Sequence, residues 1–130
     1  MTIPHDRKFT TTHEWVKVDG EIATIGLTDF AQSELGDITY LELPGVGAKV
    51  SKAESLGVVE SVKAASDIYS PVSGDVVEEN DAAVSTPEVI NSSPWDDAWL
   101  VKVHLDDPAQ LNDLLDPVAY EKVLAESGSH

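Results

Sequence analysis

Lys63 is the residue whose type and setting point most directly to chemistry. It lies between two short stretches rich in β-branched residues, 58–62 and 67–69, which predict the strands of a hairpin with the lysine at its tip. The segment from Ala53 to Val101 contains no other lysine or arginine, so this cation is not part of a mixed-charge surface. Most lysines are simply solvated, but an amine held out at a hairpin tip is accessible to a modifying enzyme. We therefore interpret Lys63 as a candidate modification site.

The composition of the chain limits the classes of partner. Of its 130 residues, 24 are acidic and 8 are Lys or Arg, which gives a formal net charge of −16. Because nucleic acids and anionic membranes are bound by clustered basic side chains, neither is an expected partner. No apolar run is long enough to span a membrane, and the first residues lack the basic and apolar regions of a signal peptide. Protein partners with basic docking faces fit this charge better.

The residue types also exclude most kinds of catalytic chemistry. The sequence contains no cysteine, so it forms no disulfide and supplies no thiolate. The four histidines are far apart and lack the spacing of metal ligands, and we expect no metal site. The acidic pairs are neighbours in sequence rather than groups that face each other in a pocket, so we assign no catalytic residue. Any redox chemistry must come from an attached group.

Turn signals divide the chain into short elements. Alternating stretches on either side of Asp19-Gly20 predict a hairpin over 14–25. Thr28 can cap a helix over 29–35, which Gly36 ends. Further strands are predicted over 38–43, 76–79 and 99–105, and a short helix or turn over 86–94.

Two Asp-Pro pairs predict helices at the C-terminus. Asp107-Pro108 and Asp116-Pro117 each place a capping carboxylate before a proline, which the first helical turn tolerates. Together the elements predict a mainly β fold: a flattened barrel or a sandwich of two small antiparallel sheets, with a short helix near Thr28–Leu35 and C-terminal helices. We expect a monomer with one domain over 1–130. Its expected parts are an N-terminal arm over 1–8, a β core over 9–105 with the lysine hairpin within 56–77, helices over 108–126 and a tail over 127–130.

The sequence around the lysine resembles a known attachment motif. Glu60-Ser61-Val62-Lys63-Ala64 is similar to the lipoyl-attachment motif of the glycine cleavage H-protein family. Further motifs follow in the family's order over nearly the whole chain: His13-Glu14-Trp15-Val16, Gly26-Leu27-Thr28-Asp29-Phe30-Ala31-Gln32, Leu35-Gly36-Asp37-Ile38, Leu43-Pro44, Pro87-Glu88-Val89-Ile90-Asn91, and Leu114-Leu115-Asp116 to Tyr120-Glu121. The resemblance implies a lipoyl/biotinyl-type fold. One departure is the segment Trp95–Leu100, where the family commonly has glycines that tolerate positive φ; we expect another turn geometry there, or stabilisation by its Asp side chains.

By resemblance, Lys63 carries lipoate in amide linkage, and the protein is a carrier rather than an enzyme. The implied partners are a pyridoxal-phosphate glycine decarboxylase, which loads an aminomethyl group, and a tetrahydrofolate-dependent aminomethyltransferase, which unloads it. A flavin-dependent dihydrolipoamide dehydrogenase reoxidises the lipoyl group, and lipoylating enzymes attach it. The expected location is a bacterial cytoplasm, or the mitochondrial matrix for a mature organellar chain.

The resemblance also implies roles for residues near the lysine. The set expected to be recognised by the lipoylating enzyme is Glu60, Ser61, Val62, Ala64 and Asp67. The set expected to form a cleft for the loaded arm is Glu14, Leu35 and Asp67. Simpler interpretations remain open: Glu60 and Asp67 as edge charges that prevent aggregation, Glu14 as a solvated carboxylate and Leu35 as a packing residue.

Other functions also remain open. The protein could pass lipoate to 2-oxoacid dehydrogenases as a relay donor, a role that the sequence does not separate from glycine cleavage. It could instead be an unmodified acidic binding or regulatory module on the same fold, although an isolated lysine in an intact motif argues against this. Biotin attachment is disfavoured because biotinyl hairpins usually place Met on both sides of the lysine, where this chain has Val62 and Ala64.

Overall fold

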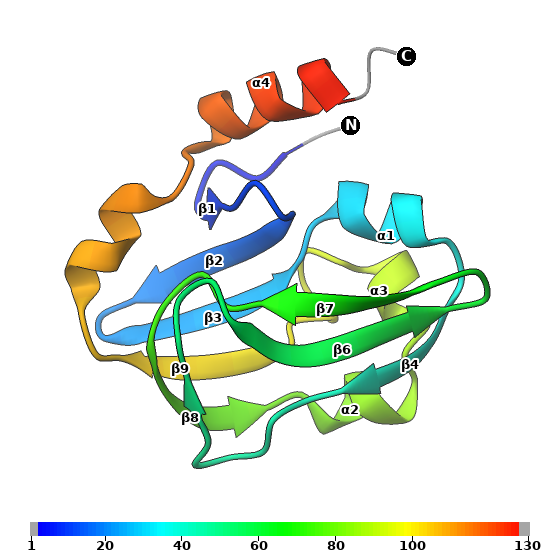
Figure 1. The fold of residues 1–130 in the computed structure, drawn as a ribbon, viewed down its shortest axis with the longest axis horizontal. Helices are drawn as coiled ribbons and strands as arrows, with labels where there is room; N and C mark the ends of the chain where they lie inside the picture. Colours follow the sequence, from blue (N-terminus) through cyan, green and yellow to red (C-terminus); the bar gives the residue numbers. More distant parts are fainter. Residues whose placement is uncertain (1–2, 128–130) are drawn as a thin grey trace.

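Two antiparallel sheets form the framework of the protein, for which the computed structural model describes residues 3–127 (Figure 1). The six-stranded sheet has the order β1-β2-β3-β9-β8-β5, with β1 (Lys8–Phe9), β2 (Glu14–Asp19), β3 (Ile22–Leu27), β9 (Val101–Leu105), β8 (Gly74–Glu79) and β5 (Lys49–Val50). The three-stranded sheet has the order β4-β6-β7, with β4 (Ile38–Glu42), β6 (Ser55–Ser61) and β7 (Ala65–Tyr69). The helices are α1 (Asp29–Leu35), α2 (Asp81–Ser85), α3 (Val89–Ser92), the 3-10 helix η1 (Pro108–Asp113) and α4 (Pro117–Ser127). The predicted mainly β fold with two antiparallel sheets is confirmed, and both sheets are open.

The β2–β3 hairpin follows its sequence signal closely. Asp19 pairs with Ile22, and Glu14 at the start of β2 pairs with Leu27 at the end of β3. Gly20 in the turn has a φ of +64°, which suits a two-residue connection between twisted strands. The predicted hairpin is therefore confirmed, and its second strand runs two residues further than expected.

The main core draws its side chains from both sheets. The six-stranded sheet contributes Ile25 and Val103, and the three-stranded sheet contributes Leu41, Val59 and Ile68, all essentially buried. Removing each such side chain from water contributes about 1.5–3 kcal/mol to stability. Because side chains alternate along a strand, the neighbours of these residues on β6 and β7 face outward.

Helix α1 begins and ends where the sequence predicts. The Thr28 hydroxyl accepts a hydrogen bond from the Ala31 amide at 3.2 Å, as an N-cap should. Gly36 ends the helix with a φ of +80°, and its amide donates to the Gln32 carbonyl. Ala31 and Leu35 pack on the main core. The helix therefore packs against the sheets, and a short segment connects it to β4.

The C-terminal segment differs in part from the prediction. Asp107 accepts from the Ala109 amide at 3.0 Å and Asp116 from the Ala119 amide at 2.7 Å, so both Asp-Pro pairs do begin helices. The first is a 3-10 helix rather than an α-helix. It stops because Leu115 exchanges backbone hydrogen bonds with Phe9, which requires extended chain. Residues 128–130 of the expected tail, and residues 1–2 of the expected arm, lie outside the described residues.

The other expected elements between β8 and β9 are found with different bounds. The strand expected over 99–105 begins at Val101, and the Trp99 carbonyl before it accepts from the side chain of Asn80. Helix α3 lies within the expected short helix or turn over 86–94, whereas α2 was not expected.

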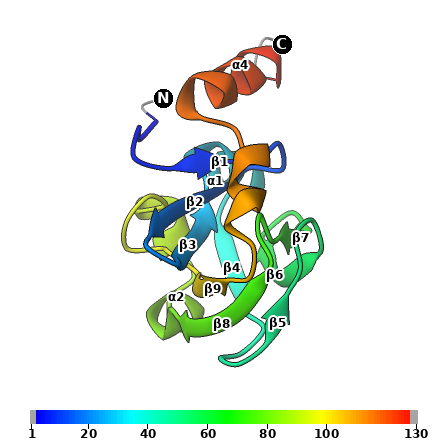
Figure 2. The same cartoon turned by 90° about the vertical axis from the view of Figure 1, so that its left-hand side faces the viewer.

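A second apolar cluster joins the two ends of the chain. It is formed by Ile3, Phe9, Trp15 and Tyr120, and the Phe9 and Tyr120 rings stack with centroids 4.6 Å apart. Figure 2 shows the result: α4 lies at one end of the molecule beside β1. Within residues 3–127, no helix is both long and apolar enough to cross a bilayer.

Gly26→Ala should destabilise the protein through a clash with Trp15. An added Cβ would lie 2.3 Å from Cε2 of the indole, which is buried and fixed by a 2.9 Å hydrogen bond from Nε1 to the Pro94 carbonyl. We expect the free energy of unfolding in urea to fall by about 2–3 kcal/mol. Gly20→Ala is the matched control: its Cβ meets nothing within 4 Å, so only the positive φ should cost about 1 kcal/mol. Equal losses in the two variants would contradict the clash.

Candidate lysine site and adjacent pocket

Strands β6 and β7 converge on a tight turn that carries Lys63. In Figure 1 this tip extends beside the segment that connects α1 to β4. The Ser61 amide donates to the Ala64 carbonyl at 2.7 Å, and the Ser61 hydroxyl accepts from the amides of Lys63 and Ala64 at 3.3 and 3.2 Å. The serine therefore satisfies the backbone of the turn, which places the lysine at its apex.

The Lys63 side chain leaves the tip with its amine free. Its Cε atom lies 3.8 Å from the position that a Cβ on Gly36 would occupy, so the stem of the lysine crosses the end of α1. Within the described part of the chain, no carboxylate lies within ion-pair distance of its Nζ atom, in contrast to Lys49, Lys52 and Lys102. The amine is therefore available for acylation.

The residues expected to be recognised by a lipoylating enzyme surround this tip. Val62 is 71% exposed, which is unusual for a β-branched side chain. Glu60 and Ala64 are exposed, and Ser61 is half-buried in the turn. Asp67 is exposed on β7, where its Oδ1 atom accepts from the Ser55 hydroxyl at 3.2 Å. The structure thus brings this set together on one hairpin.

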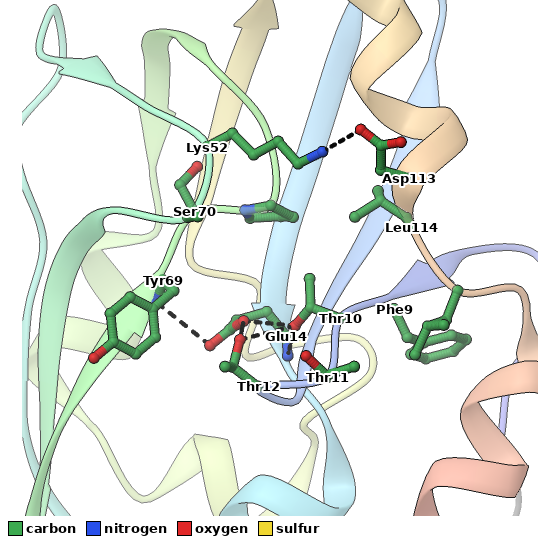
Figure 3. Close-up of a pocket in the computed structure, with 13 residues that line it drawn as sticks. Phe9, Thr10, Thr11, Thr12, Glu14, Lys52, Tyr69, Ser70, Asp113 and Leu114 are labelled. Carbon is green, nitrogen blue, oxygen red and sulfur yellow. Dashed lines mark hydrogen bonds and ion pairs between the residues drawn. The ribbon is translucent and has the colours of Figure 1, made fainter.

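A pocket of about 510 Å³ lies near the far end of β7 (Figure 3). Four segments form its walls, with the lining residues Phe9, Thr10, Thr11, Thr12 and Glu14; Lys52 and Ala53; Tyr69, Ser70 and Pro71; and Asp113, Leu114 and Leu115. Lys52 and Asp113 form an ion pair at 2.5 Å that joins two of these walls. Seven of the thirteen lining residues are polar or charged, so the pocket combines apolar walls with several hydrogen-bonding groups.

Glu14 is the buried carboxylate of this pocket. Its residue is only 2% exposed. Oε1 accepts from the hydroxyls of Thr10 and Thr12 at 2.6 and 2.5 Å, and Oε2 accepts from the Tyr69 amide at 3.3 Å. Burial raises the pKa of Glu14, and the hydrogen bonds oppose that rise. A cation that enters the pocket would therefore stabilise the ionised form of the Glu14 carboxylate.

The three residues expected to form a cleft do not all line this pocket. Leu35 is half-buried at the end of α1, where it packs on the core close to the Lys63 stem. Asp67 lies on β7 between the lysine tip and the pocket. The sequence analysis missed Thr10, Thr12 and Tyr69; the run of threonines before Glu14 is the local signal that indicates a hydroxyl-lined carboxylate.

The histidines make separate contacts. His13 Nδ1 lies 2.9 Å from the Tyr120 hydroxyl, and burial lowers the pKa of His13 while Glu34 opposes this. His104 lies 3.3 Å from Glu21 on the surface. In the part of the chain that the structure describes, no group of three or more His, Cys, Asp or Glu residues is arranged to hold a metal ion.

Comparisons with known proteins identify relatives over almost the full chain. The family model described as "Glycine cleavage H-protein" matches residues 7–127. A glycine cleavage system H protein of Carboxydothermus hydrogenoformans is 53% identical over 97% of this chain and 97% of its own length. A mitochondrial one from Oryza sativa subsp. indica is 52% identical over 99% of this chain and 79% of its own length. A crystal structure of a glycine cleavage system H protein from Mycobacterium marinum superposes with a TM-score of 0.86 at 36% identity, covering 97% of this chain and 99% of that one.

Glu14 should titrate above 4.5, the ordinary value for a glutamate, because burial disfavours its charged form more than the hydrogen bonds favour it. The folded protein then holds this proton at pH values where the unfolded chain has lost it. The contribution of Glu14 to stability is therefore largest below the unfolded pKa and is lost as the pH rises to the folded pKa. A ¹³C NMR titration of the side-chain carboxyl measures the midpoint directly.

Urea unfolding of Glu14→Gln tests the same linkage. As the pH rises through this range, the difference in unfolding free energy should shift in favour of Glu14→Gln over the wild type. Glu54→Gln, which removes a negative charge from an exposed position, controls for net charge. A midpoint below 4.5, or a shift in the opposite direction, would show that burial does not dominate at Glu14.

Proposed function

The chain belongs to the glycine cleavage H-protein family, and from this membership we propose that Lys63 is the residue that carries lipoate in amide linkage. The family serves glycine cleavage as a lipoyl carrier. The observation that supports Lys63 is its place at the apex of a hairpin, with no ion pair to its amine within residues 3–127. An amide forms when Nζ displaces the leaving group of an activated lipoate carboxyl, so the nitrogen must be exposed, must lose one proton to attack and loses a second as the amide forms. Nothing in its described surroundings obstructs this.

The rest of the chain gives the modified lysine a fixed root and an inert surface. When bound, lipoate would supply a reducible disulfide, one sulfur of which could hold the aminomethyl group once the S–S bond is open. The Ser61 hydrogen bonds stabilise the turn, so the backbone of Lys63 is held in a fixed position. Because the chain has no cysteine, it offers no thiol that would react with such a disulfide by exchange.

We further propose that the loaded arm is sheltered along β7. Gly36 lies near the Cε atom of Lys63 with Leu35 beside it in the chain, Asp67 lies partway along β7, and Glu14 binds the backbone at its far end. Ala65 and Tyr69 are four positions apart on the strand, a span of about 13 Å. A cationic amine that enters the pocket restores the ionised form of Glu14 against the effect of burial, and gains a charge-assisted hydrogen bond.

The protein acts in this proposal as a non-catalytic carrier and a monomer. Its partners are the pyridoxal-phosphate glycine decarboxylase, the tetrahydrofolate-dependent aminomethyltransferase, the flavin-dependent dihydrolipoamide dehydrogenase and the lipoylating enzymes. Glu60, Ser61, Val62, Ala64 and Asp67 form the surface that the lipoylating enzyme reads. The negative charge of the chain suits basic docking faces on these enzymes. The proposed location is a bacterial cytoplasm, or the mitochondrial matrix for an organellar chain.

Intact-mass analysis with peptide mapping tests the attachment site. After incubation with a lipoate ligase, ATP and lipoate, the wild-type protein should gain a single lipoyl increment on the peptide that contains Lys63. Lys63→Arg keeps the positive charge and should gain none. Lys49→Arg, at another exposed lysine, should be modified like the wild type. A folded wild-type protein without the increment would overturn the proposal and favour an unmodified binding module.

The lifetime of the loaded arm tests the shelter. We expect Glu14→Ala to release the aminomethyl group at least about tenfold faster than the wild type, the equivalent of one charge-assisted hydrogen bond. The measurement follows formaldehyde release from the purified loaded protein. Glu54→Ala, at an exposed position, should leave the lifetime unchanged. An unchanged lifetime in Glu14→Ala would remove Glu14 from the arm site without affecting the assignment of Lys63.

A further inference from the structure

Asn91 on α3 binds the segment between α1 and β4 with its whole side-chain amide. Its Oδ1 atom accepts from the Ile38 amide at 2.9 Å. Its Nδ2 atom donates to the Gly36 carbonyl at 2.8 Å and to Oε1 of Gln32 at 2.9 Å. The opposite orientation of the amide would set two donors against each other at Ile38, so the pattern of partners fixes the orientation. Asn91 thus makes three hydrogen bonds to residues more than fifty positions away.

The segment held by Asn91 supports the lysine tip. Gly36 and Ile38 flank Asp37, whose carbonyl accepts a 3.0 Å hydrogen bond from the amide of Val62, the residue before Lys63. The Cε atom of Lys63 also lies close over Gly36. The tip is therefore attached to the body of the protein at Asp37, and Asn91 binds both neighbours of that residue.

Asp37 lies between the end of one element and the start of the next. Helix α1 has ended at Leu35, and Gly36 has a positive φ of +80°. The pairing of β4 with β6 is irregular between Ile38 and Tyr40, where the register shifts. A side-chain amide here supplies the bonds that neither the helix nor the strand ladder provides.

We infer that Asn91 is a positioning residue for Lys63. By holding the Gly36–Ile38 segment, Asn91 keeps the hairpin tip, and with it the Lys63 amine, in one position. This inference rests on the proposed function of Lys63 as the acylated residue. Asn91 acts mainly on the position of the amine. Of the residues in the proposed docking surface, Glu60 and Asp67 lie on the β6–β7 pair and keep their positions, and only the tip residues beside Lys63 depend on the held segment. Misplacing a reacting atom by about 1 Å can cost up to about 100-fold in rate.

Steady-state lipoylation with the unmodified protein as the varied substrate tests the inference. We expect Asn91→Ala to lower kcat by about tenfold and to leave KM within about twofold, since Glu60 and Asp67 keep their positions in the docking surface while the tip and its amine are displaced. Amide hydrogen exchange in the unmodified protein gives a readout that does not depend on lipoylation. The Val62 amide should exchange about tenfold faster in Asn91→Ala, because its acceptor is no longer held.

Asn80→Ala is the matched control. Asn80 is also a poorly exposed asparagine, and its Nδ2 atom donates to the carbonyls of Asp97 and Trp99 at 2.8 and 2.7 Å, away from the tip. It should lose a comparable amount of unfolding stability while kcat and Val62 exchange stay near their wild-type values. If Asn91→Ala matches Asn80→Ala in both readouts, Asn91 is only a folding residue and the inference is overturned.

Asn91→Asp keeps the inference testable if the alanine variant does not fold. The aspartate keeps the acceptor for Ile38 but loses both donated bonds and sets an oxygen against the Gly36 carbonyl. We expect its loss of kcat to equal or exceed that of Asn91→Ala, and wild-type kcat would overturn the inference. A wild-type protein that takes no lipoyl increment would instead refute the proposed function, so the two failures are distinct.

Discussion

The burial of Ile68 on β7 fixes both parts of the site. Because side chains alternate along a strand, placing Ile68 in the core forces Asp67 and Tyr69 to the outer side. The strand begins directly after the turn that carries Lys63, and at its other end the Tyr69 amide binds Glu14. The lysine tip and the pocket are thus two ends of one element. A slip of one residue would turn every side chain of β7 to the other face and place Asp67 and Tyr69 in the core.

A line of uncharged groups connects the C-terminal helix to the same site. The Tyr120 hydroxyl donates to the Thr28 hydroxyl at 2.8 Å, and Thr28 caps α1. Burial raises the pKa of Tyr120 to about 12, and it lowers the pKa of His13, which also contacts Tyr120. Both groups therefore stay neutral at physiological pH, so burying their hydrogen bonds does not require a nearby counter-charge. Helix α4 in this way stabilises the first turn of the helix that leads to Asp37.

Features that depend on near neighbours in sequence could be predicted, and features that depend on distant partners could not. The cap at Thr28 and the turn at Asp19-Gly20 involve residues within a few positions, and the structure confirms both. The burial of Glu14 could not be predicted, because one of its donors lies 55 positions away. The partners of Asn91 are equally distant. The 3-10 form of η1 was missed because Asp107-Pro108 signals only where a helix begins.

The segment after Pro94 shows how distant contacts replace local conformational freedom. It lacks the glycines that the family commonly has there, and among the described non-glycine residues only His13 and Ala53 have positive φ. The turn therefore uses another geometry. Two side chains from the N-terminal part of the chain stabilise it: the Trp15 indole donates to the Pro94 carbonyl, and the Arg7 guanidinium donates to the Trp95 carbonyl. Burying the Arg7 cation would be costly alone, but Asp6 pairs with it and the Trp15 ring lies 4.6 Å beneath it. Contacts with the N-terminal segment thus fix the conformation of this turn, which glycines would otherwise reach through their own backbone freedom. One of these contacts comes from Trp15, whose ring also requires a glycine at position 26.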